Sequence, residues 1–351
     1  MRNNKLCSSG IGGQAVMEGI MMRNKDQYAV AVRQADGSVV LDKQEYKGIT
    51  SKCRLFRVPF IRGIFSFIDS LILGIKTLTF SAKFFDDEAD YSEEPDKFEQ
   101  WLVDKFGDKA EKVIMGFTVV FSIIIAIGLF MVLPLFVADI MERYVSWVTP
   151  GHVPVIEGIV KMVLFIAYLL LISLMNDIKR TFMYHGAEHK CINCIENGHV
   201  LTVENVRKSS RYHKRCGTSF LLVVLIISII MFILIRTDII WVRYVTRILL
   251  VPVIAGISYE FIRKAGSSNN KIINALSMPG MWMQKITTKE PTDDMIEVAI
   301  EAVEAVFDWE QYLDDNGIKR TPKRKVMPVD QQPLPKEYKK DRKGSGYNWK
   351  F

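Results

Sequence analysis

Hydrophobic residues are not spread evenly along the 351-residue chain but collect in long runs with few or no charges. Residues 113–137 form a run of 25 positions without a charge, which can cross about 30 Å of hydrocarbon. Residues 159–175, 217–235 and 239–261 form three more runs, and the last is the least apolar because it contains two arginines. The pattern therefore predicts a mainly α-helical, polytopic membrane protein with about four transmembrane helices.

A further apolar segment, residues 58–83, carries charges at intervals of seven: Arg62, Asp69, Lys76 and Lys83. On a helix these charges form one narrow stripe that drifts by about 20° per heptad, and the remaining surface is apolar. We therefore expect an amphipathic helix that lies in the membrane interface or packs against the spanning helices. A further membrane span is the alternative.

The first 57 residues contain two short apolar alternations, residues 28–32 and 39–41, separated by an Asp-Gly pair, and they predict a small N-terminal β-hairpin. The glycine-rich residues 10–14 do not qualify as a phosphate-binding loop, because they follow no predicted strand and open no predicted helix. Residues 292–307 predict a capped amphipathic helix. The predicted segments are 1–57 with the hairpin, 58–85 with the amphipathic helix, an acidic linker at 86–112, the spanning region at 113–261, a C-terminal segment at 262–318 and a basic, disordered tail at 319–351.

The distribution of charge predicts the orientation. Residues 177–216, between the second and third runs, hold eight Lys and Arg, whereas residues 138–158 hold one. By the positive-inside rule, the 177–216 connection and both termini face the cytosol of a cell-membrane protein. Five cysteines and no secretory pattern agree with reduced thiols on that side. The net charge of +7 derives from the tail, so nucleic acid is not an expected partner.

Candidate chemistry is concentrated in the 177–216 connection, which contains four of the five histidines. His185, Glu188 and His189 follow the pattern H-x-x-E-H, which on a helix places two imidazoles on one face with a carboxylate between them. The two histidines would bind a divalent metal, for which zinc is the best match, and Glu188 would act as general base. His213 and Cys216 are the leading candidates for a third ligand. The alternative is a set of polar residues in an interfacial loop that binds no metal.

Cys191 and Cys194 form a C-x-x-C pair in the same connection. They could complete a structural zinc site or form a redox pair. No second C-x-x-C and no thioredoxin-like context accompany them, so two ordinary buried or interfacial thiols are the favoured interpretation.

Several blocks of sequence together resemble one family: residues 12–23, 58–63, 184–190, 201–206, 215–219, 255–260, 279–284 and 287–291. On these blocks the chain resembles the YqhQ-like bacterial membrane proteins, from about residue 8 to about residue 310. This family has no known function, and its members are commonly labelled predicted metal-dependent enzymes on the same His, Glu and Cys pattern. The resemblance implies that the N-terminal block and the 177–216 connection form one unit. The matching positions are Gln14, Glu18, Arg23, His185, Glu188, His189, His213 and Cys216.

The leading hypothesis is a cytosol-facing, metal-dependent membrane enzyme, a hydrolase acting on a membrane-embedded or lipid-linked substrate. Gln14, Glu18, Arg23 and Glu196 are candidate pocket residues. The competing hypothesis is a non-enzymatic membrane scaffold or regulatory subunit with a structural polar cluster. Candidate partners are membrane lipids, a second copy of the chain or another membrane protein.

Overall fold

A computed structural model describes residues 8–52, 56, 58–84, 101, 105, 110–235, 239–267 and 270–318. Cys7, Cys53, most of the acidic linker and the basic tail lie outside these residues. The sheet consists of β1 (Gly12–Val16), β2 (Gly19–Asn24), β3 (Gln27–Arg33) and β4 (Val39–Glu45). The helices are α1 (Ile49–Lys52), α2 (Ile61–Ala82), α4 (Ala110–Ile127), the π-helix η3 (Gly128–Val132), α5 (Leu133–Tyr144), α6 (Val153–Ile172), α7 (Asn176–Glu196), α8 (Val203–Lys208), α9 (Gly217–Leu234), α10 (Ile240–Leu249), α11 (Val251–Ser267), α12 (Lys271–Thr287), α13 (Asp293–Val306) and α14 (Trp309–Asp315).

The described residues include five helical stretches that are long and apolar enough to cross a membrane. They are Ile61–Ala82, Val113–Tyr144, Val153–Ile172, Gly217–Leu234 and Trp241–Gly266. The last four match the predicted runs, which confirms a mainly helical, multi-pass membrane protein. The fifth candidate is α2, the segment predicted as an amphipathic helix with a membrane span as the alternative.

The least apolar run is accommodated by ion pairs with neighbouring helices. Arg247 in α10 donates from Nε and Nη2 to Glu157 Oε2 of α6, at 3.1 and 2.9 Å. Arg243 of the same helix donates from Nη1 to Asp139 Oδ1 of α5 at 2.5 Å. Buried charges at membrane depth are expensive unless they are paired, so these bonds explain how two arginines fit in this span.

The N-terminal β-structure is larger than predicted. The hairpin at residues 28–41 is confirmed as β3 and β4, with Val32 opposite Val40. Two more strands precede it, and the four form an antiparallel sheet in the order β1-β2-β3-β4. The sequence did not reveal β1 and β2, because their glycines carry no alternation signal and β2 is buried along most of its length.

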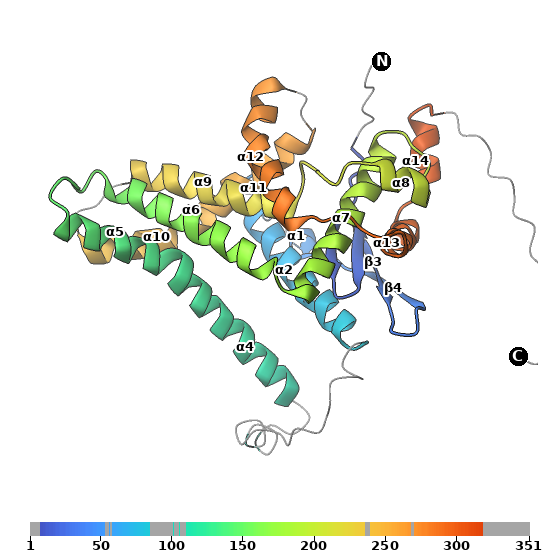
Figure 1. The fold of residues 1–351 in the computed structure, drawn as a ribbon, viewed down its shortest axis with the longest axis horizontal. Coiled ribbons are helices and arrows are strands. Elements are labelled where there is room, and N and C mark those ends of the chain that lie inside the picture. The colour runs from blue at the N-terminus through green and yellow to red at the C-terminus, as the bar shows by residue number, and fades with distance from the viewer. Residues whose placement is uncertain are drawn as a thin grey trace, which may run out of the picture.

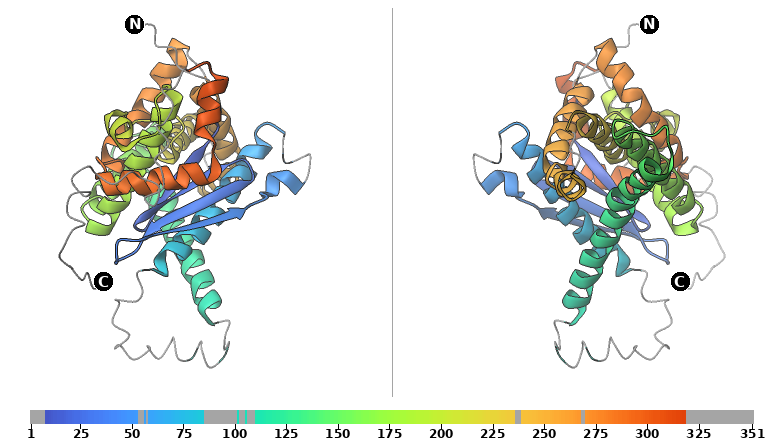
Figure 2. Two further views of the ribbon diagram at one scale, coloured as in Figure 1. Left: turned by 90° about the vertical axis from the view of Figure 1, so that its right-hand side faces the viewer. Right: turned by 90° about the vertical axis from the view of Figure 1, so that its left-hand side faces the viewer.

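The sheet is covered by helices on both faces, because alternate side chains of β3 belong to two different hydrophobic cores. Ala29 and Ala31 belong to one core with α7 and α13, whereas Val30 and Val32 belong to a second core with Leu73 of α2. Neighbouring side chains on a strand point to opposite faces, so each face has its own helical cover. Figure 1 shows α5, α6, α9 and α10 together on one side of the molecule, and the sheet, α7, α8 and α13 on the other. Figure 2 shows α13 lying across the sheet.

Candidate metal centre

One face of α7 supplies most of the candidate site. Its side chains follow the helical spacing i, i+3, i+4 and i+7, which places them on one face. All of them line a pocket of about 480 Å³: His185, Glu188, His189 and Ile192. The opposite face of α7 is buried in the core with the sheet and α13. The helix is therefore fixed from behind while its polar face borders the pocket.

Three side chains converge as a possible metal-binding group. One potential ligand atom from each of His185, His189 and Cys216 lies within 4.8 Å of the other two. His185 Nε2 is 3.3 Å from Cys216 Sγ. Ligands of tetrahedral zinc, at bond lengths of about 2.0–2.3 Å, lie roughly 3.3–3.7 Å apart, so this spacing suits a shared ion.

Backbone carbonyls set the tautomer of both histidines. His185 Nδ1 lies 2.9 Å from the carbonyl oxygen of Thr287, and His189 Nδ1 lies 2.7 Å from that of Arg211. A carbonyl oxygen only accepts, so Nδ1 is the donor in both rings and Nε2 is the nitrogen of each ring that this contact leaves available. The same arrangement holds metal-ligating histidines in other proteins. Each ring thus uses Nδ1 for the backbone and leaves Nε2 as the nitrogen that could bind an ion.

Cys216 lies at the N-terminal cap of α9, and its charge state is set by the histidines. Burial raises the pKa of its thiol, but His185 and His189 outweigh burial and hold that pKa well below its usual range. Burial likewise lowers the pKa of His185, and the contact with Cys216 reverses this and raises it to about 9. Cys216 is therefore a thiolate, the form that binds a metal or attacks an electrophile.

Glu188 is buried but borders the pocket, and its carboxylate has no hydrogen-bonding partner among the residues that the structure describes. Gln14 and Arg23 line the same pocket. Glu18 lies elsewhere, because its carboxylate binds Arg180 and accepts from the Tyr184 hydroxyl at 3.3 Å. The pocket thus has one free carboxylate beside the three-residue group.

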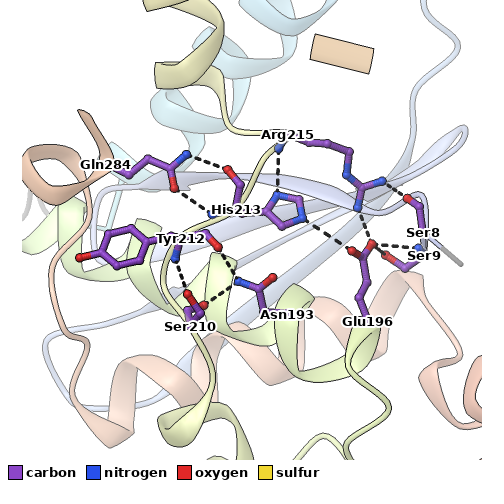
Figure 3. Close-up of polar contacts among 9 residues, drawn as sticks. All are labelled: Ser8, Ser9, Asn193, Glu196, Ser210, Tyr212, His213, Arg215 and Gln284. Carbon is purple, nitrogen blue, oxygen red and sulfur yellow. Dashed lines mark hydrogen bonds and ion pairs between the residues drawn. The ribbon is translucent and has the colours of Figure 1, made fainter. Parts of the chain in front are cut away.

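His213 lies beside His189, with ring centroids 5.7 Å apart, but it does not belong to the three-residue group. Figure 3 shows the contacts that His213 makes with Arg215, Glu196 and Gln284. Its Nδ1 accepts the backbone N–H of Arg215 at 3.3 Å, and its Nε2 faces Glu196 Oε2 at 3.7 Å. Gln284 binds the backbone N–H and carbonyl of His213 at 2.8 and 2.7 Å. Between the two candidates for a third ligand, the geometry brings Cys216 to the histidines and turns His213 toward Glu196.

Glu196 is the centre of a second polar cluster rather than a pocket residue. It binds Arg215, and it accepts from both the backbone N–H and the hydroxyl of Ser9 at 2.9 Å. Burial raises the pKa of Glu196, but His213 and Arg215 lower it to about 2. This cluster connects the N-terminal block, α7 and the loop before α9.

Acid should remove the stability that Glu196 supplies. Because its folded pKa of about 2 lies below the ordinary value of 4.5, the contribution is complete above about pH 4.5 and is lost as the pH falls toward 2. Its size is at most about 3 kcal/mol. We expect Glu196→Gln to destabilise the protein at pH 6 and to differ less from wild type at pH 3, as measured by thermal unfolding. A difference that does not change with pH would contradict this.

The C-x-x-C pair takes no part in the site. Cys191 and Cys194 are buried free thiols in the core behind α7, and burial raises the pKa of both. They match the interpretation as ordinary buried thiols.

The residues that sequence reasoning missed act mainly through the backbone. The carbonyls of Arg211 and Thr287 orient the ligands, and no side-chain pattern could reveal them. Gln284, whose amide binds the backbone of His213, and Thr218, whose hydroxyl lies 2.9 Å from Cys216 Sγ, fall in the resemblance blocks 279–284 and 215–219, but those blocks indicated no role for either residue. Their roles depend on α9 and α12 packing together, which the sequence alone does not specify.

Fold and site together define a multi-pass membrane protein with a buried His-His-Cys group that could hold a metal. Residues 58–309 match the family described as a protein of unknown function (DUF1385), and the chain belongs to this family. It is similar to the uncharacterized protein YqhQ of Bacillus subtilis (strain 168), with 35% identity over 312 residues, 87% of this chain and 94% of the relative. These matches confirm the resemblance found in the sequence. No solved structure matches the chain.

Proposed function

We propose that the protein is a metal-dependent membrane hydrolase whose site faces the cytosol and whose substrate is membrane-embedded or linked to a lipid. One observation carries the proposal: His185, His189 and Cys216 converge beside Glu188 on the wall of one pocket. The same pocket is also lined by the apolar side chains of Ile11, Met21 and Leu73. A polar reacting group and an apolar anchor could therefore be bound together.

The donor set favours zinc. Two imidazoles and one thiolate are typical zinc ligands, whereas magnesium and calcium prefer oxygen. Three protein ligands with a fourth position open are typical of catalytic rather than structural zinc. The ion would lower the pKa of water and polarise a carbonyl or phosphoryl oxygen of the substrate.

The remaining residues have distinct roles in this scheme. Glu188 would accept a proton from the attacking water, because its carboxylate borders the pocket and is not engaged by another group. Arg23 and Gln14 would bind the polar part of the substrate from the sheet side of the pocket. The cytosolic placement rests on the excess of Lys and Arg in residues 177–216.

Metal content tests the proposal directly. Purified wild-type protein should contain about one tightly bound divalent ion per chain, and His189→Ala should lose it, because two of three ligands do not hold zinc firmly. His199→Ala is the matched control: this histidine is exposed and lies outside the three-residue group. Elemental analysis of the three proteins gives the result. Wild-type protein that is folded and free of metal would refute a metal-dependent reaction.

A second candidate function is covalent catalysis by Cys216. Cys216 Sγ lies 3.3 Å from His185 Nε2. This separation is close to that between a cysteine nucleophile and the histidine that serves as its acid-base partner, and it favours this function. In that case the wild-type protein would contain no metal, and iodoacetamide would alkylate Cys216 at neutral pH. Added zinc that blocks alkylation would favour the metal site instead.

A further inference from the structure

The sheet and α7 form one folded unit on one side of the membrane. Ser9, just before β1, hydrogen-bonds to Glu196 at the end of α7, and Glu18 in the β1–β2 turn binds Arg180 near its start. Both elements also belong to one hydrophobic core together with α13. Such contacts require the sheet, α7 and α13 to lie on the same side of the bilayer.

This placement limits how many helices can cross. Between the sheet and α7 the chain passes through three candidate spans: α2, Val113–Tyr144 and Val153–Ile172. Three crossings would leave the sheet and α7 on opposite sides, so an even number must cross. Residues 86–99 hold eight acidic residues and add no crossing. Between α7 and α13 there are two further candidate spans, and two crossings agree with the contacts.

The contacts of α2 identify it as the helix that does not cross. Its first turns meet α11 and the start of α9: Gly63 lies against Gly256 and Tyr259, and the rings of Phe67 and Phe220 have centroids 5.6 Å apart. Had α2 crossed, it would continue along these helices toward their far ends. From Asp69 onward it follows the sheet instead.

Polar contacts tie the rest of α2 to the sheet and the segment that follows it. Asp69 accepts from the Tyr46 hydroxyl at 3.1 Å and the backbone N–H of Ile49 at 2.9 Å. Lys76 donates to Gln44 at 2.7 Å. Asp69 and Lys76 of the charge stripe therefore face the sheet and the segment after it, whereas Arg62 pairs with Glu260 of α11. A sheet with a charged outer strand could not accompany a helix through hydrocarbon.

We propose that α2 lies at the membrane surface, on the side of the site, and that its outer face contacts lipid. Leu71, Ile72, Ile75 and Leu78 occupy that face at helical spacing and are 39–50% exposed. The occupant is the boundary of headgroups and acyl chains of the same bilayer, because α2 begins against α9 and α11, whose own outer surfaces are apolar. Four helical stretches then cross, and both the sheet and α13 lie on one side.

The position of α2 also places the pocket. Ser66, Asp69 and Ser70 of α2 line it, together with Tyr259 of α11. The pocket therefore opens at the level of the lipid headgroups, where a lipid-linked molecule presents its polar part. This last step deepens the proposed function and rests on it, whereas the placement of α2 does not depend on a metal.

Cysteine labelling in intact and permeabilised cells tests the crossing count. In a parent protein with Cys7 and Cys53 changed to serine, one cysteine at a time replaces Ala35 in the β3–β4 turn, Ser92 between α2 and α4, or Ser146 between α5 and α6. The parent itself measures any labelling of the buried Cys191, Cys194 and Cys216. We expect Ala35→Cys and Ser92→Cys to react with an impermeant maleimide on the same side, and Ser146→Cys on the opposite side. Labelling of Ser92→Cys on the side opposite to Ala35→Cys would overturn the proposal. The comparison does not depend on which side is cytosolic.

Photocrosslinking tests the occupant of the outer face. Benzoylphenylalanine replaces Ile72 on α2 in one variant and Leu41 on β4 in another; these side chains are 46% and 47% exposed. In native membranes the Ile72 variant should form adducts with lipid, and the Leu41 variant should form far fewer. A protein adduct at Ile72 without lipid adducts would show that this face binds a protein partner and would overturn the lipid contact.

Discussion

Glu188→Gln should keep its metal and its fold and lose hydrolysis by roughly 10²–10⁴-fold, the usual contribution of a general base. The amide has nearly the same shape as the carboxylate but cannot accept a proton at neutral pH. Because Glu188 has no hydrogen-bonding partner among the described residues, the substitution breaks no bond that holds the structure together. Its effect should therefore be confined to chemistry.

Three measurements on the variant separate the roles of Glu188. They are metal content, thermal unfolding and hydrolysis of lipid-linked phosphate and carboxylic esters by protein in proteoliposomes. Glu204→Gln is the control, because this exposed acid of α8 pairs with Lys208 away from the pocket. Loss of metal from Glu188→Gln would make Glu188 a ligand. Undiminished hydrolysis by Glu188→Gln would rule out Glu188 as the general base. Absence of any hydrolysis by the wild-type protein would favour a structural metal in a non-enzymatic scaffold.

Elements whose signal lies in hydropathy could be predicted from the sequence. The four strongest apolar runs all became helices of spanning length, because hydrocarbon imposes a length and composition that few other segments satisfy. The amphipathic stripe of α2 was also visible, but its partner was not. The middle of α2 packs on the sheet through Leu73, and half of that sheet consists of strands β1 and β2, whose glycine-rich residues give no periodic signal.

The candidate site was predictable to the extent that one helix builds it. His185 and His189 are neighbours through helical spacing alone, and their rings lie 4.4 Å apart. The third ligand depends on tertiary structure. His213 and Cys216 are only three residues apart, and what separates their roles is that Glu196 faces the imidazole of His213 while Cys216 caps α9 beside the histidines. No spacing rule contains that information.

Gly186 lies inside α7 for a structural reason that the sequence does not show. Glycine in a helix interior costs about 1 kcal/mol relative to alanine, so helix propensity alone disfavours it at this position. The helix α7 nevertheless runs without interruption through this position. A Cβ at Gly186 would lie 2.1 Å from the carbonyl oxygen of Lys289, so the glycine permits a close approach between α7 and the segment after α12.

Gly186→Ala should therefore destabilise the protein and empty the metal site, although alanine is the better helix former. The neighbouring segment cannot easily withdraw, because the Lys289 N–H donates to the Phe182 carbonyl at 2.9 Å. If it moves, the Thr287 carbonyl leaves His185 Nδ1 and the ligand loses its orientation. Overpacking of this kind costs about 1–3 kcal/mol, which equals or exceeds the gain in helix propensity.

Thermal unfolding and metal content of purified protein measure both effects. We expect the unfolding midpoint of Gly186→Ala to fall by a few degrees, at roughly 2–4 °C per kcal/mol, and its metal content to fall well below that of wild type. Gly116→Ala is the matched control, since a Cβ at this helical glycine of α4 would meet no atom within 4 Å. That variant should be as stable as wild type and keep its metal. If the Gly186→Ala protein unfolds at or above the wild-type temperature, then α7 and the Lys289 segment separate at no cost. If it also retains its metal, then the Thr287 carbonyl is not needed to orient His185.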